Sequence, residues 1–302
     1  MSALEKQSLT FADRFSHIKQ KIFILFWLVL AYFFIQSTFS TLLALYSITK
    51  MNASYFTIEV LEDKAFYKRV DAPPASWTPL TQISKKIQGA IISSEDGRFY
   101  LHPGYDLEQL RDAIFDSFVR KKKMRGASTI TQQLVKNLFL KKEKTFGRKI
   151  QEFGMALMLE RYADKKKILE AYLNVIEYGK GIYGIKAATL YYFHKHPSQV
   201  TAREAAFLAM LLPSPKKYSK SFSKKQLTPF ARKMVASILL KMRQGGIIGE
   251  EEHLRELNSH FFWERVIVEK SLDASENKEG IINDSSEDSI SEETNNDESD
   301  DI

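Results

Sequence analysis

The longest apolar pattern of the chain lies near its start, over residues 22–46. No charged residue occurs between Lys21 and Lys50, a stretch of 28 residues. A helix needs about 20 apolar residues to cross a bilayer, so the pattern predicts a transmembrane helix over 22–46. The alternative is a cleaved signal peptide, whose apolar part usually runs only about 7–15 residues before small residues at the cleavage site. Cations precede the segment at Lys6, Arg14, Lys19 and Lys21.

Those cations predict the orientation of the chain, because cytoplasmic flanks are enriched in Lys and Arg. Residues 1–21 are therefore expected in the cytoplasm. The remainder is expected on the extracytoplasmic side of the cytoplasmic (inner) membrane, held by a single pass.

Beyond Pro79 the apolar residues recur at the three- and four-residue spacing of helices. Such spacing covers 83–92, 107–118, 150–158 and 168–173, and an almost wholly apolar run covers 202–212 before Pro213 and Pro215 end it. A strand-like stretch occurs at 55–61. The pattern predicts a mostly α-helical protein, with a connector over 47–76, a main domain over 77–245 and a helical extension over 246–270.

Charge divides the chain unevenly. Residues 271–302 hold twelve Asp and Glu against one Lys, a net charge of −11, whereas residues 1–270 hold 43 Lys and Arg against 25 Asp and Glu, a net charge of +18. The acidic segment lacks the apolar surface that offsets ordering entropy, so we expect a disordered tail. The basic body predicts an anionic partner. Its place outside the cytoplasm favours membrane lipids or a phosphorylated substrate, and not nucleic acid.

The chain contains no cysteine. Disulfides, thiol catalysis and cysteine-ligated metal centres are therefore excluded.

The first motif with candidate chemistry begins at the end of the 83–92 stretch. Glu95 and Asp96 are adjacent there, and Phe99, His102 and Gly104 follow. A carboxyl group beside apolar neighbours can have a raised pKa and accept a proton near neutral pH. The structural alternative is a capped helix end with two solvated acids.

The second motif marks the start of a helix. Thr129 and Gln132 have the spacing of a capping box, and a helix N-terminus suits a phosphate group. Gln132 and Lys136 share one face, as do Gln133 and Asn137. The alternative is an amphipathic helix with a solvated polar face.

The third motif places two cations beside one acid. Arg148 and Lys149 precede Glu152 by four and three residues, so all three lie on one side of a helix. The alternative is a surface ion pair worth less than about 1 kcal/mol. The fourth motif, from Lys167 to Phe193, is rich in small residues and is expected to have a structural role.

Taken in this order, the four motifs resemble those of the peptidoglycan glycosyltransferases, glycosyltransferase family 51. The resemblance runs from about Trp77 to Tyr218, through Glu-Asp-x-x-Phe-x-x-His-x-Gly, Gly-x-Ser-Thr-x-x-Gln-Gln, Arg-Lys-x-x-Glu and Ile-Leu-Glu-x-Tyr-Leu-Asn. The chain looks most like the monofunctional biosynthetic transglycosylase branch, because no penicillin-binding domain follows. The resemblance implies a lysozyme-like helical domain.

The family joins lipid II to a nascent glycan chain, with release of undecaprenyl diphosphate and inversion at the anomeric carbon. The resemblance implies that Glu95 is the general base and that Glu152 acts near the donor diphosphate. The other positions that match the family's substrate-binding motifs are Asp96, Phe99, His102, Ser128, Thr129, Gln132, Gln133, Lys136, Asn137, Lys144, Arg148 and Lys149.

The resemblance also implies cofactors and partners. No cofactor is required, and a divalent cation, Mg²⁺ or Mn²⁺, at Glu152 is an option. The expected partners are lipid II, the nascent glycan chain, membrane lipids, other cell-wall synthases and divisome proteins.

Two positions depart from the family pattern. Ala127 replaces a second Gly before Ser128-Thr129, and Lys144 stands where many members carry Arg. Lysine keeps the charge but lacks the bidentate fork of arginine, which predicts a weaker grip on a diphosphate.

Two other functions compete with the transferase. A lytic transglycosylase or muramidase of the same fold shares one Glu in a helical domain, and an inactive scaffold needs neither acid. The second and third motifs disfavour the lytic enzyme, because cutting a finished glycan requires no diphosphate site.

Overall fold

The computed structural model describes residues 3–62, 64–118, 128–140 and 145–264. Three predicted features lie outside these ranges: the acidic tail over 271–302, the last residues of the helical extension, and Lys144. Helices dominate the described chain, as the sequence predicts. The stretches expected to be helical correspond to α2, α3, α5, α6 and α8, which confirms those predictions.

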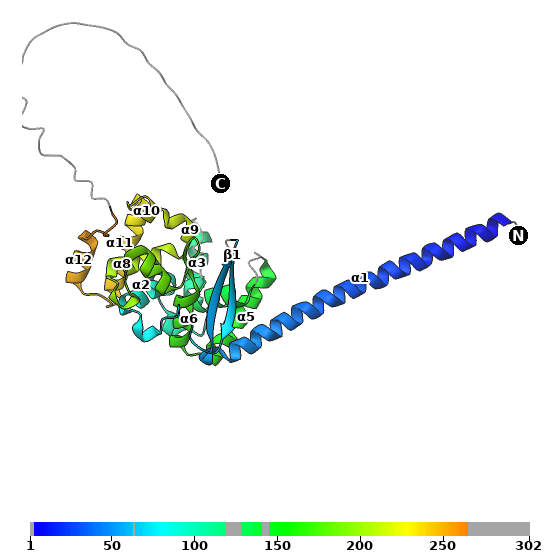
Figure 1. The fold of residues 1–302 in the computed structure, drawn as a ribbon, viewed down its shortest axis with the longest axis horizontal. Coiled ribbons are helices and arrows are strands. Elements are labelled where there is room, and N and C mark those ends of the chain that lie inside the picture. The colour runs from blue at the N-terminus through cyan, green and yellow to red at the C-terminus, as the bar shows by residue number, and fades with distance from the viewer. Residues whose placement is uncertain (1–2, 63, 119–127, 141–144, 265–302) are drawn as a thin grey trace, which may run out of the picture. The chain divides into compact units, whose positions relative to one another are not determined.

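The elements follow one another along the chain as drawn in Figure 1. The α-helices are α1 (Ala3–Thr49), α2 (Lys85–Glu95), α3 (Leu107–Phe118), α4 (Ile130–Phe139), α5 (Phe146–Tyr162), α6 (Lys165–Val175), α7 (Ile185–Phe193), α8 (Ala202–Leu211), α9 (Pro215–Tyr218), α10 (Lys220–Ser223), α11 (Pro229–Gln244) and α12 (Glu250–Asn258). The strands are β1 (Tyr55–Leu61), β2 (Lys64–Val70), β3 (Glu177–Gly179) and β4 (Ile182–Tyr183). The 3₁₀ helices are η1 (Met51–Ala53), η2 (Leu80–Gln82), η3 (Phe99–Leu101) and η4 (Pro197–Gln199).

Helix α1 contains the long apolar segment of the sequence. Many of its large apolar side chains are exposed, including Phe23 and Leu28, each at 62%. Among the residues that the structure describes, no helix combines the length and the apolar character needed to cross a membrane. The transmembrane helix over 22–46 therefore stays a prediction.

Helix α8 forms the centre of the core. All ten of its residues are buried, which agrees with its nearly continuous apolar sequence. It contacts both α2 and α11, and these two helices also contact each other, so the three pack as one group. Thr201 and Glu204 form a capping box at its start, and the helix ends at Leu211, just before Pro213.

The fourth motif joins helix α6 to the segment that precedes α2. Glu170 accepts hydrogen bonds from the indole N–H of Trp77 at 3.0 Å and from the backbone N–H of Leu80 at 2.9 Å. The Asn174 side chain accepts from the N–H of Thr78 and donates to its carbonyl, both at 2.8 Å. These bonds confirm the structural role expected for this motif.

Strands β1 and β2 form an antiparallel hairpin, with Tyr55 opposite Val70 and Leu61 opposite Lys64. The strand predicted at 55–61 is therefore confirmed. In β2, exposed and half-buried residues alternate through most of the strand, as expected for a ribbon that packs one face on the domain.

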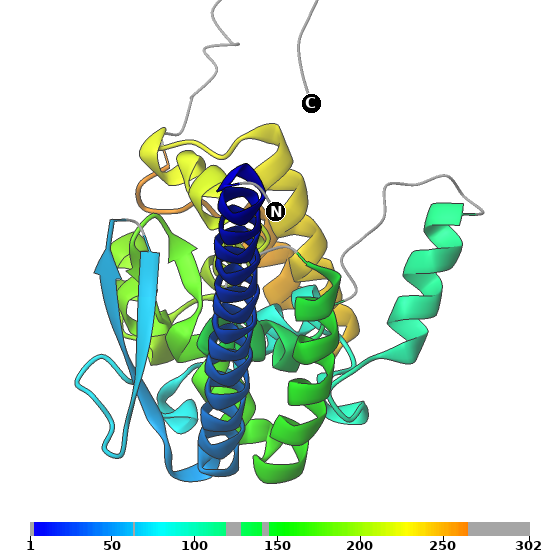
Figure 2. The same cartoon turned by 90° about the vertical axis from the view of Figure 1, so that its right-hand side faces the viewer.

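The residues after α12 cover the core with aromatic rings. Phe261 and Trp263 stack with centroids 4.7 Å apart and planes 1° from parallel, and both contact Phe207 of α8. Phe262 points the other way and is 63% exposed. The part of the predicted extension within the described ranges thus packs onto the domain. Figure 2 draws the end of the described chain in orange.

Gly184, at the start of α7, adopts a φ of +80°, and a Cβ there would lie 2.6 Å from the carbonyl oxygen of Asn174. Replacement by Ala is expected to lower the free energy of unfolding by about 1–3 kcal/mol from backbone strain alone. Gly154 is the matched control, because its Cβ would meet nothing within 4 Å in the middle of α5. Gly154→Ala is expected to raise stability by about 0.5–1 kcal/mol. Urea unfolding followed by circular dichroism measures both changes, and equal effects would contradict the strain argument.

Candidate active site

Glu95 is the last residue of α2 and is half-buried. Its carboxylate accepts a hydrogen bond from the side-chain amide of Gln133 on α4 at 2.9 Å. The carbonyl oxygen of that amide accepts in turn from the hydroxyl of Tyr172 on α6, at 3.0 Å. Residues from three helices therefore hold the candidate base. The fully buried Tyr172 binds the oxygen of the Gln133 amide, so the amide nitrogen points toward Glu95.

The surroundings of Glu95 raise the pKa of its carboxyl group. Burial is the largest cause, because it removes water from the charged form, and the neighbouring Asp96 charge raises the pKa further. The Gln133 hydrogen bond and the Lys136 and Lys241 charges act in the opposite direction, but burial prevails. A carboxylate with a raised pKa is a stronger proton acceptor than a solvated one.

Removing the Gln133 amide is expected to raise the pKa of Glu95 further. In Gln133→Met the carboxylate loses a hydrogen bond that favours its charged form, whereas desolvation remains. A ¹³C NMR titration of the Glu95 carboxyl group measures this as a midpoint at higher pH. Asn137→Met, one turn further on the same face of α4, is the matched control and is expected to leave the midpoint in place. A lower or unchanged midpoint in Gln133→Met would contradict the assignment.

Glu152, on α5, is the second candidate acid and is only 2% exposed. Arg148 donates to one of its oxygens at 2.7 Å and Lys149 to the other at 2.5 Å. The sequence spacing predicts this grouping, and the structure confirms it. Lys149 also donates to the Ser128 hydroxyl at 3.0 Å, which connects α5 to the residues before α4. The buried Nε of Arg148 has no hydrogen-bond partner among the described residues.

Lys136 interacts electrostatically with both acids. The pKa of its ammonium group is lowered, chiefly by desolvation and also by the Arg148 and Lys149 charges, while Glu152 and Glu95 act to raise it. Both carboxylates influence this one lysine, so the Glu95 and Glu152 regions belong to one site. The residue as a whole is nevertheless exposed, which leaves its side chain accessible to a ligand.

Helix α4 begins with the predicted capping box. The Thr129 hydroxyl accepts from the backbone N–H of Gln132, whose side chain accepts from the backbone N–H of Thr129. Thr129 also donates to the carbonyl of Gly104 at 2.7 Å, so the cap is tied to the first motif. Gln132 is buried and lies 3.5 Å from the Lys149 ammonium, whereas Asn137 is half-buried on the same helix.

Asp96 and His102 form a buried pair next to this cap. The imidazole Nε2 of His102 donates to Asp96 at 2.8 Å, because its Nδ1 already accepts from the backbone N–H of Gly104 at 3.2 Å. The other Asp96 oxygen accepts from the backbone N–H of Ile130 at 2.9 Å. The first motif therefore anchors the start of α4, and substrate contact by Asp96 and His102 stays a prediction.

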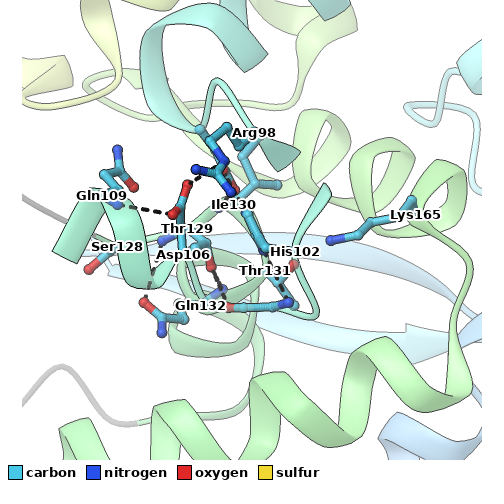
Figure 3. A network of polar contacts seen from close by, with 12 residues as sticks. Arg98, His102, Asp106, Gln109, Ser128, Thr129, Ile130, Thr131, Gln132 and Lys165 are labelled. Atoms are coloured by element: carbon cyan, nitrogen blue, oxygen red, sulfur yellow. Dashed lines mark hydrogen bonds and ion pairs between the residues drawn. The ribbon is translucent and has the colours of Figure 1, made fainter. Parts of the chain in front are cut away.

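The polar network around this pair extends to Arg98, Asp106 and Gln109, as Figure 3 shows. Asp106 accepts from the backbone N–H of Gln109 at 2.9 Å and lies 3.7 Å from the Nε of Arg98. Phe99 is fully buried, and the Lys165 ammonium lies 4.4 Å from the centre of its ring. Phe99 has no exposed surface, and its contact with substrate stays a prediction.

Glu152 has no carboxylate oxygen left unpaired for a metal cation. Both of its oxygens already pair with cationic side chains. The group of three potential ligands found among these residues is Asp96, His102 and Asp106, whose ligand atoms lie within 4.8 Å of one another. Their oxygens and nitrogens are engaged with one another or with backbone groups. Divalent-ion chemistry at Glu152 therefore fits this arrangement poorly.

Sequence reasoning missed Lys241 and gave Tyr172 only a packing role. Lys241 lies on α11, and no local motif surrounds it. Tyr172 stands in the fourth motif, where its spacing signals burial but not its bond to Gln133. Both act on Glu95 through tertiary contacts, which local patterns do not encode.

The four motifs, the helical fold and the Glu95–Glu152 site together define a class of protein. The transglycosylase family model matches residues 61–243. The chain belongs to the transglycosylase family.

Several curated relatives carry the name biosynthetic peptidoglycan transglycosylase. The protein of Cupriavidus metallidurans is 46% identical over 144 residues, which cover 48% of this chain and 62% of that protein. The Shewanella amazonensis protein is 42% identical over 54% of this chain and 70% of its own length. The Burkholderia lata protein is 37% identical over 65% of this chain and 82% of its own length. The chain thus spans less than two thirds of the Cupriavidus relative.

Proposed function

We propose that this protein is a peptidoglycan glycosyltransferase that polymerises lipid II into glycan strands. The observation that carries the proposal is the pairing of Glu95, whose pKa is raised by burial, with a cationic group built from Lys136, Arg148 and Lys149. Membership of the transglycosylase family and the names of the relatives support it. The substrate and the stereochemistry come from the resemblance to the family.

In the proposed reaction the 4-hydroxyl of the acceptor sugar attacks the anomeric carbon of the donor. The Glu95 carboxylate takes the hydroxyl proton as the new C–O bond forms, and the bond from the anomeric carbon to the diphosphate oxygen breaks. Undecaprenyl diphosphate leaves with the bonding electrons. Attack opposite the leaving group inverts the anomeric centre, which requires a base on one side and positive charge on the other.

The cationic side chains suit the leaving diphosphate. Arg148 keeps its Nε free among the described residues, and guanidinium groups bind phosphate oxygens through paired N–H donors. Glu152 holds Arg148 and Lys149 in place from the buried side. We assign Glu152 to positioning these cations, and no step passes through a metal ion.

Purified full-length protein incubated with radiolabelled lipid II tests the proposal. We expect glycan polymer, resolved by gel electrophoresis, and release of undecaprenyl diphosphate. Absence of polymer across a range of detergents, with and without Mg²⁺ or Mn²⁺, would refute it. Cleavage of preformed glycan would instead identify the lytic enzyme. If the protein shows neither polymerisation nor cleavage, the inactive scaffold is the remaining function.

We also propose that α1 attaches the protein to the cytoplasmic membrane, with the catalytic residues on the extracytoplasmic side. The uncharged stretch between Lys21 and Lys50 and the exposed apolar side chains of that segment support attachment. The basic residues before it support the orientation. Partnership with other cell-wall synthases and divisome proteins stays a prediction.

Membrane attachment is tested by alkaline carbonate extraction. The full chain is expected to stay in the membrane pellet, and Ile24→Asp combined with Leu28→Asp is expected to release it, whereas Leu61→Asp in the hairpin is the control. Release of the unaltered chain would refute attachment. The cysteine-free sequence allows a single exposed label, Ser223→Cys, whose reaction with a membrane-impermeant maleimide in spheroplasts tests orientation.

A further inference from the structure

Two adjoining hollows lie beside α11, and neither is lined by Glu95 or Glu152. The larger, of about 590 Å³, is bounded by the loop before α11 and by the first turns of that helix. The smaller, of about 300 Å³, is bounded by α11, by Arg203 of α8 and by the residues that end α12. Arg232 and Ala236 line both, so the two hollows adjoin, and together they are called here the α11 groove.

The α11 groove is cationic. Its charged lining consists of Lys224, Lys233, Arg232 and Arg203, and none of the described residues that line either hollow is Asp or Glu. Within the described ranges, Lys224 and Lys233 form no ion pair. Asn258, Ser259 and His260 add neutral polar groups at the α12 end. This combination suits an anion that also accepts hydrogen bonds.

Arg203 is the buried member of the groove, at 6% exposure. Its Nη1 donates to the carbonyls of Glu256 and Leu257 at 3.2 and 3.3 Å, and the Phe261 ring covers its guanidinium at 4.9 Å. Its buried Nε has no hydrogen-bond partner among the described residues. A buried donor without a partner costs free energy that a bound acceptor would recover.

Two carboxylates balance part of this charge. Glu264 lies 3.7 Å from Arg203 and 3.9 Å from Arg232. Glu256 also acts on the charge of Arg203, and its side chain accepts from the Arg203 backbone N–H at 3.2 Å. Among the described residues, neither acid forms an ion pair with Lys224 or Lys233. The contact to Arg232 is long, and that side chain is 61% exposed, so its guanidinium remains available to a ligand.

We propose that the α11 groove is a second anion-binding site, which holds a phosphate group separately from the Glu95–Glu152 site. Two guanidinium groups and two ammonium groups around one groove match the tetrahedral oxygens of a phosphate ester.

The groove is distinct from the Glu95–Glu152 site. Lys233 precedes Lys241, the α11 residue that acts on Glu95, by eight positions, which is about 12 Å along the helix. The groove also uses residues beyond position 243, where the family match ends. It does not depend on the proposed transferase activity.

The phosphate has two sources with the same chemistry: the headgroup of an anionic phospholipid and a soluble phosphate ester. Full-length protein in uncharged detergent is titrated by calorimetry with pyrophosphate and, separately, with monomeric short-chain phosphatidylglycerol. Short-chain phosphatidylcholine controls for insertion of the acyl chains. Tighter binding of phosphatidylglycerol assigns the groove to the lipid headgroup, and tighter binding of pyrophosphate assigns it to a soluble ester.

The test variant is Arg232→Gln combined with Lys233→Gln, two exposed residues whose replacement spares the core. We expect its affinity for the preferred probe at the groove to fall at least about tenfold. Lys68→Gln combined with Lys166→Gln removes the same charge from exposed positions elsewhere and is expected to keep that affinity. Arg148→Gln, in the Glu95–Glu152 site, is expected to keep groove binding as well. Equal losses in the two double variants, or unchanged binding in Arg232→Gln/Lys233→Gln, would overturn the proposal.

Discussion

Replacing Glu95 by Gln is expected to lower the rate of glycan polymerisation by about 10²–10⁴-fold, the range for losing a general base. Glutamine keeps the size of the side chain and can still accept the hydrogen bond that Gln133 donates at 2.9 Å. It cannot take a proton from the acceptor hydroxyl at any pH near neutrality. The initial rate of polymer formation from labelled lipid II measures the loss.

Two controls separate chemistry from folding in this experiment. Glu177→Gln removes a half-buried carboxylate on β3 and is expected to keep the wild-type rate. Glu95→Gln should bind lipid II as the unaltered protein does, because the cationic residues remain in place. If Glu95→Gln polymerises at more than a tenth of the rate of the unaltered protein, Glu95 is not the general base.

Replacing Glu152 by Gln is expected to lower the rate by about 10²-fold and to destabilise the fold by about 2–3 kcal/mol. Glu152 is the shared counter-charge of Arg148 and Lys149, and removing one partner of a buried ion pair leaves the others uncompensated. The cost stays below that of a wholly buried pair because the Lys149 side chain is 46% exposed. Rates at several lipid II concentrations and thermal unfolding measure the two effects.

The pH profile distinguishes the two acids. The base must be deprotonated, so activity is expected to fall as the pH drops through the raised pKa of Glu95. Glu152→Gln should lower the rate while leaving that acid limb in place, because it removes positioning and not the base. Arg148→Lys retains the charge without the fork and is expected to lose about tenfold. If the acid limb of the pH profile shifts in Glu152→Gln, then Glu152 and not Glu95 is the base.

Local chemistry made much of this site predictable from sequence. Thr129 and Gln132 lie three residues apart, and both capping-box bonds form. Arg148 and Lys149 lie one helical turn before Glu152, and both ion pairs form. In each case the partners are fixed by the geometry of one helix, which the spacing of residues determines.

Contacts between distant segments were beyond the same reasoning. Gln133 lies 38 residues after Glu95, and Tyr172 a further 39 residues on, so only the packing of α2, α4 and α6 brings them together. The family resemblance places Asp96 and His102 among the substrate-binding positions, and that contact stays a prediction. Sequence reasoning did not foresee that both are buried and that Asp96 accepts a hydrogen bond from the first backbone N–H of α4.

The aromatic stack after α12 sets a practical lower limit on recombinant fragments. A fragment cut where the family match ends, at residue 243, would discard Phe261 and Trp263 and bring the rings of Phe207 and Phe193 into contact with solvent. Such a fragment would keep every residue of the Glu95–Glu152 site and yet tend to aggregate through its uncovered core. Expression trials intended for crystals should therefore extend at least to Glu264.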